Sequence, residues 1–87
     1  MTDFAQSTIK IRGETFTVRE LDGKTMRESK RLIETDRHRL DFFIASKGLV
    51  EPKLTEQELM ERPNIFADKL STEILRLTKT DDDSKNA

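Results

Sequence analysis

The sequence has 87 residues, enough for one small domain, and with 33% hydrophobic and 6% aromatic residues its core must be small. Charged residues make up 38% of the chain but nearly cancel, and a net charge of −1 argues against a general polyanion binder. The absence of cysteine excludes disulfides, thiolate metal sites and cysteine nucleophiles. The N-terminus has no basic or apolar segment typical of a signal peptide. The longest apolar run, Phe42 to Ala45, has four residues where a membrane span needs about 20, so we expect neither export nor membrane insertion.

The first predicted element is a β-hairpin. Apolar and polar side chains alternate on both sides of Gly13-Glu14, and this pattern predicts a two-residue type II′ turn at that pair. The resulting register pairs Ile11 with Phe16 and Ile9 with Val18. All four apolar side chains then share one face, which we expect helices to cover because an isolated hairpin is marginal in water.

A long amphipathic helix is predicted next, from Asp22 to about Lys47. Asp22 is a suitable N-cap, and Thr25-x-x-Glu28 offers a competing capping box. Gly48 is a suitable C-terminal stop. The helix carries one apolar stripe, which Ser29 and Asp36 interrupt, made of Met26, Ile33, Leu40 and Ile44.

Two further helices are predicted after an extended connection from Leu49 to Lys53. Thr55-x-x-Glu58 forms a capping box for a short helix that ends near Arg62-Pro63. Pro63 or Asn64 then begins the last helix, which covers about Ile65–Leu77. Its apolar stripe is Phe66, Leu70, Ile74 and Leu77.

The predicted fold class is therefore α+β, mainly α, with an N-terminal β-hairpin followed by about three amphipathic helices. Residues 1–78 form a single small domain. Residues 79–87 are polar and acidic, and we expect a disordered tail there.

Little in the sequence indicates chemistry. His38 lies between two arginines on a charged helix face, which is typical of a solvated side chain. The acidic run Asp81-Asp82-Asp83 lacks the spacing and the closing glutamate of a calcium loop. The three glycines are dispersed, so no phosphate-binding loop is indicated. We expect no enzyme activity, no catalytic residue, no metal and no cofactor.

Charge is distributed unevenly along the chain. Residues 24–39 contain six basic and three acidic residues, whereas residues 51–62 contain two basic and four acidic ones. Such segments favour contacts between helices, within the protein or between copies, or steering of a protein partner, although they could also serve solubility alone. A small nucleic-acid-binding regulatory protein that uses the basic helix 24–39 is the alternative hypothesis.

Four residues are candidate partner contacts. Phe42 lies beside the apolar stripe, next to Phe43, and is either exposed to a partner or packed under the hairpin. Arg31 and Arg39 lie in the basic segment. We predict that a partner binds Arg31, Arg39, Phe42 and Phe43.

In order, the motifs are Val18-Arg19-Glu20-Leu21 at the strand end, Leu54-Thr55-Glu56-Gln57-Glu58-Leu59 at the capping box, the break at Pro63, and the last helix from Leu70 to Leu77. This series, covering roughly residues 8–78, resembles the tail assembly chaperones of long-tailed bacteriophages and prophages. The chain departs from the family pattern at Glu51-Pro52-Lys53 and at Leu77-Thr78-Lys79.

The resemblance implies a protein that binds the tape-measure protein, a long helical chain, and helps to recruit tail-tube subunits. It also implies a homo-oligomer that works in the host cytoplasm and is absent from the finished virion. In this family a longer product often arises by translational frameshifting.

Overall fold

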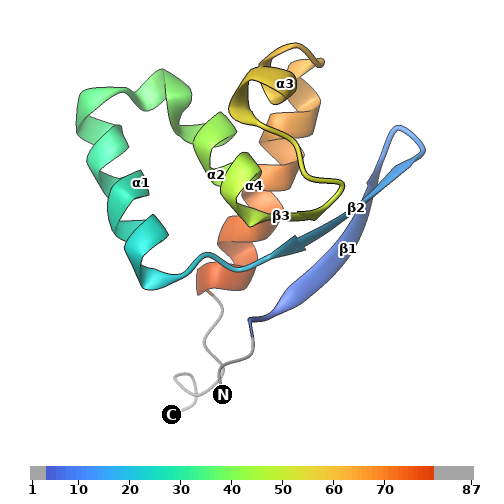
Figure 1. Ribbon diagram of the computed structural model, residues 1–87, viewed down its shortest axis with the longest axis horizontal. Coiled ribbons are helices and arrows are strands. Elements are labelled where there is room, and N and C mark those ends of the chain that lie inside the picture. Colours follow the sequence, from blue (N-terminus) through green and yellow to red (C-terminus); the bar gives the residue numbers. More distant parts are fainter. Residues whose placement is uncertain (1–3, 80–87) are drawn as a thin grey trace.

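The computed structural model of the chain describes residues 4–79. Along the chain the elements are β1 (Gln6–Ile11), β2 (Glu14–Arg19), α1 (Gly23–Thr35), the 3₁₀ turn η1 (Arg37–Arg39), α2 (Leu40–Gly48), β3 (Leu49–Glu51), α3 (Glu56–Met60) and α4 (Asn64–Lys79) (Figure 1). The predicted fold class, α+β and mainly α with an N-terminal hairpin, is confirmed. The predicted tail lies outside the described residues, apart from Lys79, which ends α4.

The hairpin forms with a different turn from the one predicted. Ile9 pairs with Phe16 and Ile11 with Glu14, so Arg12 and Gly13 make the turn. Both have positive φ, 51° and 85°, which a type I′ turn requires. The four apolar side chains of the hairpin still share one face, as predicted. The predicted register was wrong by two residues, because Phe16 pairs with Ile9 and not with Ile11.

Contacts distant in the sequence favour the observed register. Phe16 meets Phe66 of α4 edge to face, with ring centroids 5.8 Å apart. Glu14 meets Arg62, which joins α3 to α4, through two hydrogen bonds of 2.8 and 3.3 Å. The predicted register relied on local turn preference alone, which takes no account of these two contacts.

The segment predicted as an extended connection adds a third strand. β3 pairs antiparallel with β2, through Val18 with Leu49 and Thr17 with Glu51, with an irregularity between them. The strand order is β1-β2-β3, so β2 is central. The Glu51–Pro52 peptide bond is cis. Leu49 is buried, because pairing with the central strand places it against the core.

The predicted long helix is broken in two at Asp36, where φ is −158° and ψ is 72°. A straight helix over residues 22–47 would run about 39 Å, close to the longest dimension of the molecule, 42 Å. Much of its stripe would then extend past the sheet and α4. The break lets α2 turn back against α4 while α1 packs on the outer side of α2 (Figure 1).

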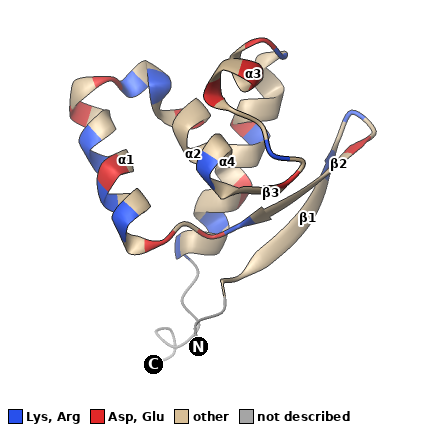
Figure 2. Cartoon of the chain, viewed as in Figure 1, with Lys and Arg blue, Asp and Glu red and all other residues tan. Residues whose placement is uncertain are grey.

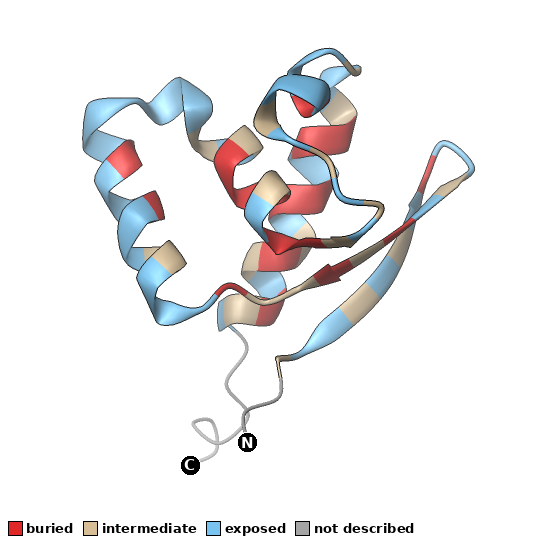
Figure 3. Ribbon diagram, viewed as in Figure 1, coloured by how far each residue is buried: buried red, intermediate tan, exposed pale blue. Residues whose placement is uncertain are grey.

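The core lies between the sheet and α4, with α2 and α3 beside it. The predicted stripe of α4 is confirmed, since Phe66, Leu70, Ile74 and Leu77 are all buried (Figure 3). The capping box of α3 is also confirmed: Glu58 N donates to Thr55 Oγ1 and Thr55 N donates to Glu58 Oε1. On the opposite face of the hairpin Gln6, Thr8, Lys10 and Thr15 are exposed, as is common for antiparallel sheets.

Candidate partner-binding groove

An apolar groove lies between α1 on one side and α2 and α4 on the other. We call it the α1 groove, and its volume is about 150 Å³. The residues that line it are Met26, Ser29, Lys30, Ile33, Leu40, Ile44, Leu75 and Lys79. Most of its lining is apolar side chain, so the groove can accept the apolar side chain of another polypeptide.

The break at Asp36 creates this groove. Met26 and Ile33 come from α1, whereas Leu40 and Ile44 come from α2, and all four belong to the single stripe that the sequence shows. Because the chain folds back after α1, the two halves of the stripe face each other across the groove. A continuous helix would have placed them in one row.

The α1 wall of the groove is only lightly packed. Ser29 and Leu32 are the buried residues of this helix, and most of the helix surface is exposed (Figure 3). Met26 is half-buried, and Ile33 is 42% exposed although it is large and apolar. The Ser29 hydroxyl donates to Met26 O at 2.8 Å, so its burial leaves no polar atom unpaired. The helix therefore offers apolar surface that the fold itself does not cover.

Local capping holds the start of α1. Asp22 Oδ1 accepts a hydrogen bond from Thr25 N at 2.8 Å, so the predicted Asp22 cap is confirmed. This hydrogen bond lowers the pKa of Asp22 below its usual range, because it favours the carboxylate. The competing capping box at Thr25 is not the one used, since Thr25 lies inside the helix.

Within residues 4–79, both charged residues that line the groove are basic: Lys30 of α1 and Lys79 at the end of α4. Basic residues recur along α1, with acidic ones between them (Figure 2). An apolar segment flanked by acidic residues would fit this combination better than one flanked by basic residues.

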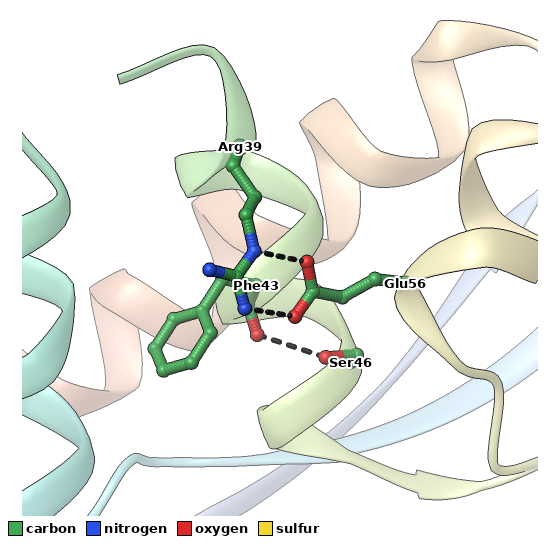
Figure 4. A network of polar contacts seen from close by, with 4 residues as sticks. All are labelled: Arg39, Phe43, Ser46 and Glu56. Carbon is green, nitrogen blue, oxygen red and sulfur yellow. Dashed lines mark hydrogen bonds and ion pairs between the residues drawn. The ribbon is translucent and has the colours of Figure 1, made fainter. Parts of the chain in front are cut away.

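Arg39 anchors the connection between α1 and α2. Its Nε and Nη2 donate to the two carboxylate oxygens of Glu56 at 2.8 and 3.0 Å (Figure 4). The guanidinium lies 5.6 Å from the centre of the Phe43 ring. The hydrogen bonds to Glu56 raise the pKa of Arg39 above its usual value. The ion pair joins the basic segment, residues 24–39, to the acidic segment, residues 51–62. It is a contact within the protein, one of the kinds that the charge pattern favours.

The structure does not bring the four predicted contact residues to one surface. Arg31 is exposed on α1 but does not line the α1 groove. Phe42 is half-buried against the core. Phe43 is 5% exposed and belongs to the core, where a partner would not reach it without a rearrangement. Arg39 is exposed but paired with Glu56. Partner binding by these residues stays a prediction.

Sequence reasoning missed the groove because it assigned the stripe of residues 26–44 to one helix. Ser29 and Asp36 interrupted that stripe and were the only signal of a change in direction. Leu75 is not one of the four residues of the predicted stripe of the last helix, and it lies on the α4 side of the groove. Lys79 was assigned to the tail. None of these positions stands out until the helices are placed in space.

The described residues contain few features suited to other chemistry. His38 is exposed within η1. Between residues 4 and 79 no group of three or more His, Asp and Glu side chains is placed to hold a metal ion. Over the same range no helix has the length and hydrophobicity that crossing a bilayer requires.

Comparison of the chain with protein-family models, curated proteins and solved structures gives no match. Any inference about function therefore depends on the motifs and on the geometry of the groove.

Proposed function

We propose that this protein is a phage tail assembly chaperone that binds an amphipathic helix of the tape-measure protein in the α1 groove. The observation that carries the proposal is the α1 groove itself, an apolar groove between helices whose charged lining residues, among those that the structure describes, are both lysines. The order of motifs along the chain, which resembles that of the chaperone family, supports the identity of the partner.

An amphipathic helix suits a groove of this kind. Such a helix presents apolar residues at positions i, i+3 or i+4 and i+7, and in a groove of this size one of them would insert while its neighbours contact the rim. Ile33 and Met26 would gain a partner for their uncovered surface. Acidic residues beside the stripe would lie near Lys30 and Lys79.

The size of the groove indicates that one contact is weak. A volume of about 150 Å³ accepts roughly one large apolar side chain, and burying one such side chain contributes about 1.5–3 kcal/mol. A dissociation constant of about 1 mM already corresponds to about −4 kcal/mol. Several copies bound along one long helix would therefore be needed for stable coating, through the gain in effective concentration that linked sites provide.

The remaining parts of the proposal follow from the family resemblance. The protein would be a homo-oligomer without enzymatic activity, and it would also recruit tail-tube subunits. It would act in the host cytoplasm and be absent from the finished virion.

A peptide titration tests the proposal. The probe is a synthetic helical peptide from the tape-measure protein with an apolar stripe flanked by glutamates, and the readout is chemical-shift change and affinity by NMR. We expect shifts at Met26, Ile33 and Leu75. Lys30→Glu and Ile33→Glu should each weaken binding by at least about tenfold, or about 1.4 kcal/mol.

Arg31→Glu is the matched control, because it makes the same charge change one residue away but outside the groove lining. It should weaken binding much less than Lys30→Glu. If the two variants lose equal affinity, or if Arg31→Glu loses more, a surface that includes Arg31 binds the partner and the groove does not. Because a single contact is weak, the deciding probe is a tape-measure segment long enough to hold several copies of the protein, and absence of binding to that segment would reject the proposal.

The alternative, nucleic-acid binding through residues 24–39, makes a separate prediction. It requires a mobility shift of DNA or RNA at low salt that weakens steeply as salt is added. Acidic residues lie between the basic ones on α1 (Figure 2), which weakens this reading.

A further inference from the structure

β1 has one edge that no element of the described residues covers. The strand order β1-β2-β3 places β1 at the outside of the sheet. Ala5 O accepts a hydrogen bond from Glu20 N at 2.9 Å. Bonded and non-bonded pairs alternate along an antiparallel ladder. In the register of the hairpin, the odd-numbered residues therefore bond to β2, and Gln6, Thr8 and Lys10 turn their backbone groups to the free edge.

The two edges of the sheet differ in how well they are protected. β3 has three residues, an irregular pairing with β2 and Pro52 immediately after it. Short strands, irregular pairing and proline are the features by which natural sheets prevent pairing with other chains. β1 has six residues, a regular register, no proline and only one charge, Lys10. Its edge is thus open to another strand.

A second groove lies directly beside this edge. It has a volume of about 350 Å³, and its lining residues are Ile9, Lys10, Asp68, Lys69, Thr72 and Glu73. The last four belong to α4, so this helix forms the other wall of the groove beside β1. An added strand at this edge would lie next to a helix surface that is already in place.

The charges beside this edge favour another copy of the same chain as the added strand. The groove is lined by two lysines, Lys10 and Lys69, and two carboxylates, Asp68 and Glu73, of which Glu73 is paired with Arg76 within α4. A second copy would bring both Asp68 and the two lysines to this surface, so each sign of charge can find its opposite. A strand of strongly acidic or strongly basic sequence would be repelled by the groove residues that carry the same charge.

We propose that two copies of this protein pair through their β1 strands, antiparallel about a two-fold axis at Thr8, into one continuous sheet. In this register Thr8 faces Thr8 of the second copy and Gln6 faces Lys10, so every outward backbone group finds a partner. An axis at Ile9 would instead make the two Lys10 side chains diagonal neighbours, about 7–8 Å apart. The surface is separate from the α1 groove, so this inference does not depend on the proposed function.

A cysteine cross-link tests the pairing, because the chain contains no cysteine of its own. Hydrogen-bonded antiparallel partners have Cα atoms about 5.5 Å apart, which is within the range of a disulfide. Thr8→Cys should therefore give a covalent dimer under mild oxidation. Thr15→Cys is the control, since it is exposed on the same face but lies on the central strand. The Thr15→Cys variant should stay mostly monomeric under the same oxidation.

A charge exchange provides the second test, read out by sedimentation equilibrium of the full chain. Thr8→Lys and Thr8→Glu each place like charges opposite each other at the axis and should raise the dimer dissociation constant by at least tenfold. An equimolar mixture should restore association, and Thr8→Ala should retain it. The proposal is overturned if the unmodified chain stays monomeric at millimolar concentration, if neither charged variant weakens association, or if the mixture fails to restore it.

Discussion

Gly48 shows how one residue can have a role that its local context does not reveal. The helix does end at Gly48, as the sequence predicted, but without the left-handed backbone of a helix-ending glycine, because Gly13 is the only described glycine with positive φ. Gly48 is instead buried at the end of α2 against α4. A Cβ at this position would lie 2.6 Å from Ile74 Cγ1, and Ile74 is itself fully buried. Glycine is needed here because the two helices approach closely.

Gly48→Ala should therefore destabilise the protein. The gain in helix propensity is at most about 1 kcal/mol, whereas overpacking a core costs about 1–3 kcal/mol. We expect a net loss of about 1–2 kcal/mol in the free energy of unfolding, measured by urea denaturation. Gly23→Ala is the control, because a Cβ there meets nothing within 4 Å. Equal stability of the two variants would argue against the close approach.

At the scale of elements, a few long side chains join segments that are distant in the sequence. Arg62 forms an ion pair with Glu14 of β2, and its guanidinium lies 5.0 Å from the centre of the Phe66 ring and 5.8 Å from that of Phe16. It therefore connects the hairpin to the start of α4. Arg39 connects the α1–α2 break to α3 in a similar way. These contacts hold the elements in the arrangement that forms both grooves.

Arg62→Ala should lower the free energy of unfolding by about 1–2 kcal/mol, because it removes an ion pair and two cation–π contacts. Glu14→Ala removes the ion pair alone and should cost less than about 1 kcal/mol. Chemical denaturation of both variants measures the difference. If Glu14→Ala costs as much as Arg62→Ala, the aromatic contacts contribute nothing.

At the scale of the whole molecule, the packing is uneven. α4 has six buried residues and lies at the centre of the core, whereas α1 has two. Figure 3 shows α1 as the most exposed of the long helices. The helix that forms one wall of the proposed binding groove is thus the one that the rest of the fold holds least firmly.

Amide hydrogen exchange should reveal this difference. We expect the amides of α1 to exchange at least about tenfold faster than those of α4, which corresponds to an opening free energy lower by about 1.4 kcal/mol. A bound tape-measure peptide should slow exchange in α1 more than in α4. Equal protection of the two helices in the free protein would contradict the uneven packing.

The sequence by itself determined the features that depend on neighbouring residues. The Asp22 cap and the Thr55–Glu58 capping box involve groups three residues apart. The apolar face of the hairpin and the stripe of α4 follow from the periods of a strand and a helix. These features were predicted correctly because their energies arise within a few residues of chain.

Only the tertiary structure decided the turn at Arg12-Gly13, the break at Asp36, the third strand and the two grooves. Each depends on contacts between residues far apart in the chain, such as Phe16 with Phe66 and Arg39 with Glu56. A local pattern cannot weigh such contacts, since their free energy appears only when the elements pack together. For this reason the residues that line the α1 groove were visible in the sequence as a stripe but not as a site.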